Sequence, residues 1–169
     1  MDLSQIIFLV LAVVILGSDL LVVTTRNIVH AALWLIVTLF GVAALYADLS
    51  AGFLAVVQVV IYIGAIAILF IFAVMLTRKE MRDRGPQLNT AWWLSALVAL
   101  LTFAGLFLLV RSWTGFGVLA GVIPAGFDAV GQLGNALVSP NAFVLPFEVA
   151  SVLLLAALIG AVYIAFSRQ

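Results

Sequence analysis

The chain has 169 residues, of which 67% are hydrophobic and 8% are charged, and its mean hydropathy is +1.38. A soluble domain of this size does not present such a composition to water. The formal net charge is zero and no basic run is interleaved with aromatic residues, so nothing suggests nucleic-acid binding. Cysteine is absent, which excludes disulfides, thiolate metal sites and iron–sulfur ligation in this chain. The length and the apolar composition predict a single membrane domain over residues 1–169.

Five stretches are long and apolar enough to cross a bilayer, whose core of ~30 Å requires about 20 helical residues. We expect an all-α integral membrane protein with helices at about 3–24, 28–47, 52–77, 91–110 and 142–166. The first stretch follows Asp2 instead of a basic segment and lacks a small-residue cleavage site, which predicts a retained helix and not a signal peptide. No internal repeat is apparent, and this disfavours a self-contained transporter.

The distribution of lysine and arginine predicts the orientation, because these residues concentrate in cytoplasmic loops. With five spans and the N-terminus outside, Arg111 is the only one of the seven basic residues on the outer side. The opposite orientation reverses this count. We therefore predict an N-out, C-in protein with a long outer loop between the fourth and fifth helices.

Two acidic residues fall inside the predicted spans, where charge is costly and each carboxylate is a functional candidate. Asp19 and Glu148 differ in depth by roughly 17 Å at 1.5 Å per residue, so they form two separate sites. Asp19 is either an interfacial residue directed toward Arg26 or part of a proton or water path. Glu148 follows Pro146 in the first turns of its helix, where the helix dipole favours a carboxylate. It is either structural or exchanges protons.

The single histidine and the tryptophans fit the membrane interface. His30 opens the second span without a second histidine or a carboxylate nearby, so we expect an interface anchor and no metal site. The four tryptophans lie at or near span ends, as in an interfacial aromatic belt: Trp34, Trp92, Trp93 and Trp113.

The third stretch, 52–77, would span about 39 Å as an α-helix, which exceeds the bilayer core and requires tilt, overhang or local rewinding. Gly64 lies near its middle, where glycine permits close helix approach and lowers the cost of a kink or a π-bulge. Spacings of three and four predict a protein-facing stripe of small and polar residues: Ala55, Gln58, Tyr62 and Ala65. From the residues alone, ordinary helix packing is the favoured interpretation.

The connection 112–141 is rich in glycine, which argues against a sixth span. Phe127, Val130, Leu133 and Leu137 recur at helical spacing. A short interfacial helix on the outer face and an irregular loop packed on its neighbours are equally consistent with this pattern.

Three stretches, 26–33, 53–75 and 145–162, closely resemble the J-type membrane subunit of proton-translocating NADH:quinone oxidoreductase, respiratory complex I. They cover the second, third and fifth spans in order. The most specific match is the run Tyr62-Ile63-Gly64-Ala65.

The resemblance implies a core membrane-arm subunit in a bacterial inner membrane that is not catalytic alone. It implies no cofactor in this chain; flavin, iron–sulfur clusters and quinone are expected in partner subunits, and the electron donor is not set by this chain. The expected partners are the quinone-site H-type, K-type, A-type and antiporter-like N-type subunits, and lipid. In that family the third helix has a π-bulge near the residues matching Tyr62, Ile63 and Gly64. Its bulged and regular forms are thought to break or complete a water chain that couples quinone reduction to proton translocation.

One departure from the family concerns the water path. Some bacterial members have glutamate where this chain has Gln58, and a glutamine orients water but cannot carry a proton as a carboxylate does. Glu148 then becomes the candidate proton carrier at that depth. Residue counting places Gln58 and Glu148 both about 9–10 Å outward of the middle, and we hypothesise that they share a contact or a water.

Two other functions remain open, an independent small transporter or channel and a structural scaffold. Five spans with two acidic residues offer little polar lining for a transport path. Migration in a large assembly with flavin and iron–sulfur absorbance distinguishes the complex I subunit from both.

Overall fold

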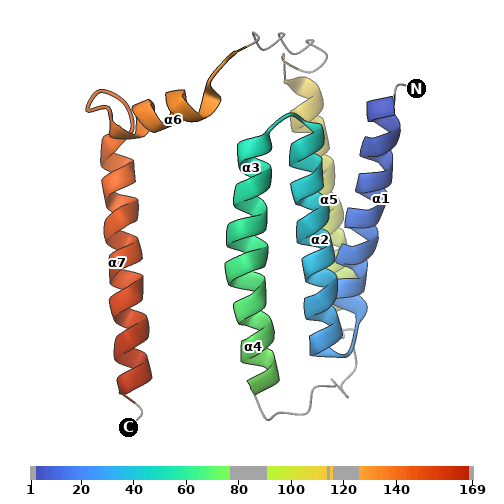
Figure 1. The fold of residues 1–169 in the computed structure, drawn as a ribbon. Coiled ribbons are helices and arrows are strands. Elements are labelled where there is room, and N and C mark those ends of the chain that lie inside the picture. The colour runs from blue at the N-terminus through green and yellow to red at the C-terminus, as the bar shows by residue number, and fades with distance from the viewer. Residues whose placement is uncertain (1–2, 77–90, 114, 116–125, 168–169) are drawn as a thin grey trace. The chain divides into compact units, whose positions relative to one another are not determined.

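The computed structural model describes residues 3–76, 91–113, 115 and 126–167. Five helices in these ranges are long and apolar enough to cross a membrane (Figure 1). They are α1 (Leu3–Thr24), α2 (Ile28–Asp48), a third helix (Gly52–Leu76), α5 (Trp92–Ser112) and α7 (Val144–Phe166). The prediction of an all-α protein with five spans is confirmed, and the described helix ends lie close to the predicted ones.

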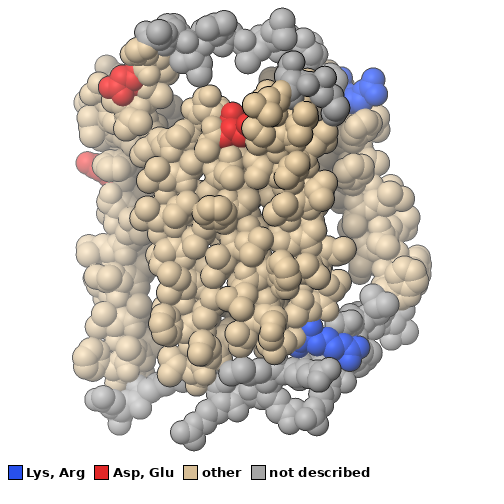
Figure 2. Space-filling model, turned by 45° about the vertical axis from the view of Figure 1, so that its right-hand side comes forward, with Lys and Arg blue, Asp and Glu red and all other residues tan. Residues whose placement is uncertain are grey.

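The surface of the helices is apolar over most of their length. In Figure 2 the charged side chains lie toward the top and the bottom of the view, and the wide area between them carries other residues. This is the distribution that a lipid environment requires. The N-out, C-in orientation stays a prediction.

The chain divides into two compact units, Met1–Phe116 and Gly117–Gln169. The described helices of the first unit are α1, α2, the third helix and α5, and those of the second are α6 (Ala129–Val138) and α7. The single membrane domain stays a prediction.

The third helix is built from three consecutive parts. An α-helix, α3 (Gly52–Val57), passes into a π-helix, η1 (Gln58–Ala67), and then into α4 (Ile68–Leu76). The backbone at both junctions stays in the right-handed helical region, so the parts form one continuous helix. A π-helix has i→i+5 hydrogen bonds, and most examples are single-turn bulges. The ten residues of η1 are therefore an unusually long insertion, and they include Tyr62, Ile63 and Gly64.

Helix α2 packs against α1 on one side and against the third helix on the other (Figure 1). Its buried residues include the small Ala32, Gly41 and Ala43. At Gly41 a Cβ atom would lie 2.6 Å from Cγ1 of Ile15 in α1, so any larger residue would force the Ile15 side chain or the two helices to shift. The three helices form the packed part of the first unit.

The turn after α2 sets the third helix beside it. Ser50 has a left-handed φ of 60°. Its N–H donates to the carbonyl of Ala47 (3.0 Å), and the N–H of Ala51 donates to the carbonyl of Tyr46 (2.8 Å). These two bonds form a Schellman cap, which satisfies the last carbonyls of α2 with backbone groups alone. The chain can then reverse direction and begin α3 at once.

In the second unit, α6 precedes and contacts α7. The Asp128 carboxylate caps α6 by accepting a hydrogen bond of 2.8 Å from the N–H of Gly131. Of the two alternatives for the long connection, 129–138 is therefore helical. Residues 116–125 lie outside the described residues, and a position of α6 on the membrane surface stays a prediction.

Candidate functional site

Three buried polar residues occur in the described part of the chain, one on each of the three packed helices. They are Ser18 in α1, Thr38 in α2 and Gln58 in the third helix. Polar side chains between helices in a membrane need hydrogen-bond partners because lipid supplies none. Their partners therefore indicate which of them serve packing.

Ser18 and Thr38 hold α1 and α2 together. The Thr38 hydroxyl lies 2.8 Å from Ser18 Oγ and donates to it. The Ser18 hydroxyl in turn lies within hydrogen-bond distance of its own helix carbonyls at Val14 (2.7 Å) and Ile15 (3.0 Å). Both hydroxyls are thus satisfied inside the chain, and the pair is a structural link.

Gln58 differs from this pair. It is 7% exposed and is the first residue of η1, yet within the described part of the chain its side chain makes no hydrogen bond. In that part, every side-chain nitrogen and oxygen that is fully buried has a hydrogen-bond partner. Since the Gln58 carboxamide has none, its polar atoms must be partly accessible, at the edge of the contact between the helices. An amide has two donor hydrogens and an acceptor oxygen, and this capacity remains available to water or to another subunit.

The π-helix changes which face of the third helix packs on its neighbour. The buried and half-buried positions along this helix follow at steps of five, four, four and three beyond Gln58: Ala55, Val57, Gln58, Ile63, Ala67, Ile71 and Val74. The step of five falls inside η1 and is the expected effect of i→i+5 bonding. Tyr62 (46% exposed) and Ala65 point away from this packed face. Of the predicted stripe, only Ala55 and Gln58 therefore lie on the face that packs within this chain. That Tyr62 and Ala65 meet another subunit stays a prediction.

Gly64 lies within the π-helix with room around it. A Cβ atom built there would meet only the carbonyl oxygen of Val59, at 3.4 Å. This is an ordinary van der Waals contact, so no close helix approach requires glycine at this position within the described residues. The role of this glycine must then lie in backbone freedom or in contacts outside the chain.

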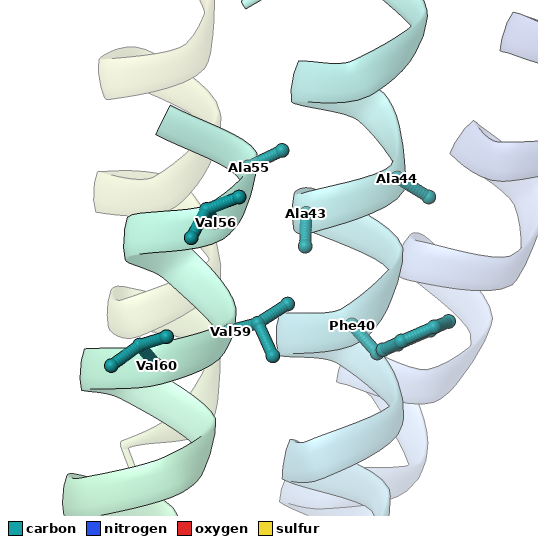
Figure 3. Close-up of a pocket in the computed structure, with 7 residues that line it drawn as sticks. All are labelled: Phe40, Ala43, Ala44, Ala55, Val56, Val59 and Val60. Carbon is teal, nitrogen blue, oxygen red and sulfur yellow. The ribbon is translucent and has the colours of Figure 1, made fainter. Parts of the chain in front are cut away.

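A shallow apolar groove of about 370 Å³ lies where α3 meets η1 (Figure 3). Three residues of α2 and four of the third helix line it: Phe40, Ala43, Ala44, Ala55, Val56, Val59 and Val60. No pattern of residues predicts this groove, because it depends on how the two helices are rotated against each other.

The two acidic candidates, Asp19 and Glu148, are both exposed within the described part of the chain. Asp19 is exposed on α1 and makes no ion pair with Arg26 within the described chain, because α1 ends at Thr24 and Arg26 follows in the turn. Glu148 is exposed in the first turns of α7, in the other unit from Gln58. Their roles, and a shared contact between Gln58 and Glu148, stay predictions.

The remaining candidates are consistent with interface positions. His30 is exposed in the first turn of α2, and no group of three or more potential metal-binding residues occurs among the described residues. Trp92 and Trp93 begin α5, Trp113 follows its end, and Trp34 lies two turns inside α2.

Comparison with known proteins agrees with this architecture. The family model of NADH-ubiquinone/plastoquinone oxidoreductase chain 6 matches residues 18–164. F(420)H(2) dehydrogenase subunit J of Methanosarcina mazei is 40% identical over 94% of this chain and 89% of its own length. NAD(P)H-quinone oxidoreductase subunit 6 from the chloroplast of Physcomitrium patens is 37% identical over 96% and 84%. NADH-quinone oxidoreductase subunit J of Rhodobacter capsulatus is 33% identical over 96% and 81%.

The matched region contains α2, the whole third helix with its π-helical part, α5, α6, most of α7 and the C-terminal third of α1. This multi-pass membrane protein belongs to the NADH-ubiquinone/plastoquinone oxidoreductase chain 6 family.

Proposed function

We propose that this chain helps to couple quinone reduction to proton translocation, through a change of its third helix between a π-helical and an α-helical register. Membership of the chain 6 family makes it a membrane subunit of a complex I-type oxidoreductase. It contributes no redox centre and is not catalytic alone. Flavin, iron–sulfur clusters and quinone are bound by partner subunits, and the names of its relatives include different electron donors.

The observation that carries this proposal is the five-residue step between Gln58 and Ile63 on the packed face. If η1 became α-helical, the residues after it would turn by about 100° and move by about 1.5 Å relative to those before it. Tyr62 would then take the place of Ile63 in line with Gln58. The stripe predicted from the sequence is thus the face of the α-helical form, and the packed face described above is that of the π-helical form.

The two registers differ in which polar side chains lie on one face of the helix and can bind water. In the α-helical form the Tyr62 hydroxyl and the Gln58 carboxamide lie on one face, where both can hold water molecules. In the π-helical form Tyr62 turns away and leaves Gln58 with apolar neighbours on its face. A water chain along this helix is therefore complete in one register and interrupted in the other.

Proton transfer itself needs other groups, because an amide does not exchange protons as a carboxylate does. We assign this role to Glu148, with Asp19 as a second candidate at a different depth. A double-mutant cycle with Gln58→Leu and Glu148→Gln tests whether the first two act together. Non-additive losses of pumping support a shared water, and additive losses show that the residues act independently.

Gly64→Val tests the register change in the intact assembly. A Cβ atom at this position meets only the Val59 carbonyl oxygen among the described residues, at 3.4 Å, so we expect the subunit to assemble. A β-branched residue stiffens the helix, so protons pumped per electron should fall while electron transfer continues. Gly105→Val in α5, where a Cβ atom also meets nothing, is the matched control. Equal loss of assembled complex and of activity in Gly64→Val would mean that the glycine serves packing alone.

The proposed setting is the bacterial inner membrane with the N-terminus outside. The partners are the H-type, K-type, A-type and N-type membrane subunits. Co-purification of the chain with flavin and iron–sulfur absorbance supports this setting, whereas a stable isolated monomer or homo-oligomer contradicts it.

A further inference from the structure

A second groove, of about 440 Å³, lies between the start of α1 and the end of α2. Its lining combines three polar and three large apolar residues: Ser4, Gln5, Asp48, Phe8, Leu9 and Leu49. The proposed coupling mechanism does not use this groove. Because it lies at the ends of two membrane-spanning helices, it is at the depth of lipid headgroups.

The position of Asp48 is electrostatically unfavourable without a cation. Asp48 is the last residue of α2, and a carboxylate at a helix C-terminus is repelled by the partial negative charge of the helix dipole. The Schellman bonds at Ala47 and Tyr46 are made by backbone groups, so the Asp48 side chain has no capping role. It also forms no ion pair within the part of the chain that the structure describes.

The other acidic residue that the structure places at a helix end behaves differently. Asp128 lies at the N-terminus of α6, where its carboxylate accepts a hydrogen bond from Gly131 and where the dipole favours negative charge. Asp128 therefore has a structural role in its own unit. Asp48 makes no such bond within the described ranges, so its carboxylate can take a cationic partner.

The apolar part of the groove indicates the kind of partner. Phe8 and Leu9 lie one helical turn, about 6 Å, deeper along α1 than Ser4 and Gln5, and both are roughly half exposed, at 46% and 47%. Leu49 is 62% exposed beside Asp48. Polar groups at the helix ends with apolar side chains one turn deeper reproduce the order of a lipid, from headgroup to acyl chain. A small soluble cation would make no contact with the apolar side chains of the groove.

We propose that this groove binds a phospholipid with a primary ammonium headgroup, of the phosphatidylethanolamine type. The ammonium group pairs with the Asp48 carboxylate, and the upper part of one acyl chain lies against Phe8 and Leu9. Lipids with an anionic headgroup, such as phosphatidylglycerol, are disfavoured because they bring negative charge to Asp48. The site does not depend on the register of the third helix.

Photo-crosslinking in native membranes that contain the assembled complex tests this site. Two lipid probes with the same photoreactive acyl chain are compared, one with an ethanolamine and one with a glycerol headgroup. The label is quantified on segment 3–9 and normalised to the amount of this chain. We expect about fivefold more label from the ethanolamine probe, the factor for one partly exposed ion pair.

Variants at Asp48 show whether the carboxylate provides the selectivity. Asp48→Asn should remove it and Asp48→Glu should retain it. Asp128→Asn makes the same chemical change while preserving a capping side chain, and it should leave the labelling unchanged.

Three results would overturn the proposal. Equal labelling by both probes, or selectivity that persists in Asp48→Asn, would show that the carboxylate does not recognise the headgroup. Absence of label from segment 3–9 in abundant complex would show that a partner subunit covers the groove. Loss of label upon addition of free phosphoethanolamine would show that a soluble amine, and not a lipid, is the ligand.

Discussion

Deleting Val60 should convert the π-helical part of the third helix into an α-helix without disturbing its packing on α2. The deletion shortens the step between Gln58 and Ile63 from five residues to four, which is an α-helical repeat. The packed positions beyond Ile63 keep their steps of four, four and three. Val60 is 61% exposed at the edge of the groove, so its side chain adds little to the contact.

Deletion of Phe70 in α4 provides the matched control. Phe70 is also exposed, at 44%, but it lies in regular α-helix. Its removal turns Ile71 and Val74 by about 100° away from their contact. If each of these two side chains loses roughly ten van der Waals contacts of ~0.1 kcal/mol, the Phe70 deletion loses ~2 kcal/mol of packing energy between the helices.

The assay is the amount of assembled complex in the membrane, followed by its electron transfer and its proton pumping. The Val60 deletion should assemble to within about twofold of the unaltered protein and transfer electrons, whereas the Phe70 deletion should lower assembly by about tenfold or more. Pumping per electron should fall in the Val60 deletion, because the helix can no longer adopt the π-helical register. If both deletions lower assembly equally, the assignment of the packed face is refuted. If the Val60 deletion assembles and pumps normally, the register change has no part in coupling.

Two further substitutions test the packing of α1 on α2, and a third tests the register change. Thr38→Val removes the hydrogen bond to α1 and should destabilise the complex by about 0.6 kcal/mol, measured by SDS-induced dissociation. Thr102→Val, which loses only a bond of 2.8 Å to its own helix, should have a smaller effect. Gly41→Val places a Cβ atom 2.6 Å from a side-chain atom of α1 and should reduce the amount of assembled complex severalfold on a native gel. Gly105→Val should not reduce it. Equal amounts of complex in the two variants would show that α1 and α2 separate easily. Tyr62→Phe should leave proton pumping nearly unchanged, because the register change is a change of the backbone. A loss of pumping as large as that of Gly64→Val would show that coupling depends on the Tyr62 hydroxyl.

The spans could be predicted because the length of an apolar run is set by the bilayer. The helical part of the long connection, Ala129–Val138, was one of two open alternatives and was indicated by the spacing of Val130, Leu133 and Leu137. These features depend on local composition and spacing, which the sequence contains directly.

The packed face of the third helix could not be predicted from the residues. Side-chain spacing in an apolar run is compatible with both i→i+4 and i→i+5 bonding, and only the contact with α2 selects Ile63 over Tyr62. The cap at Ser50 was also missed, because a left-handed φ there is usually taken by glycine. The link between Ser18 and Thr38 depends on the rotation of two helices, which hydropathy does not reveal.

The central claim is tested most directly by the backbone register of residues 58–67 in the intact assembly, determined at high resolution in two states, with and without quinone reduction under way. The account predicts i→i+5 bonding with Ile63 on the packed face in one state. In the other it predicts i→i+4 bonding with Tyr62 in line with Gln58. The same π-helical register in both states, at unchanged pumping, would contradict it.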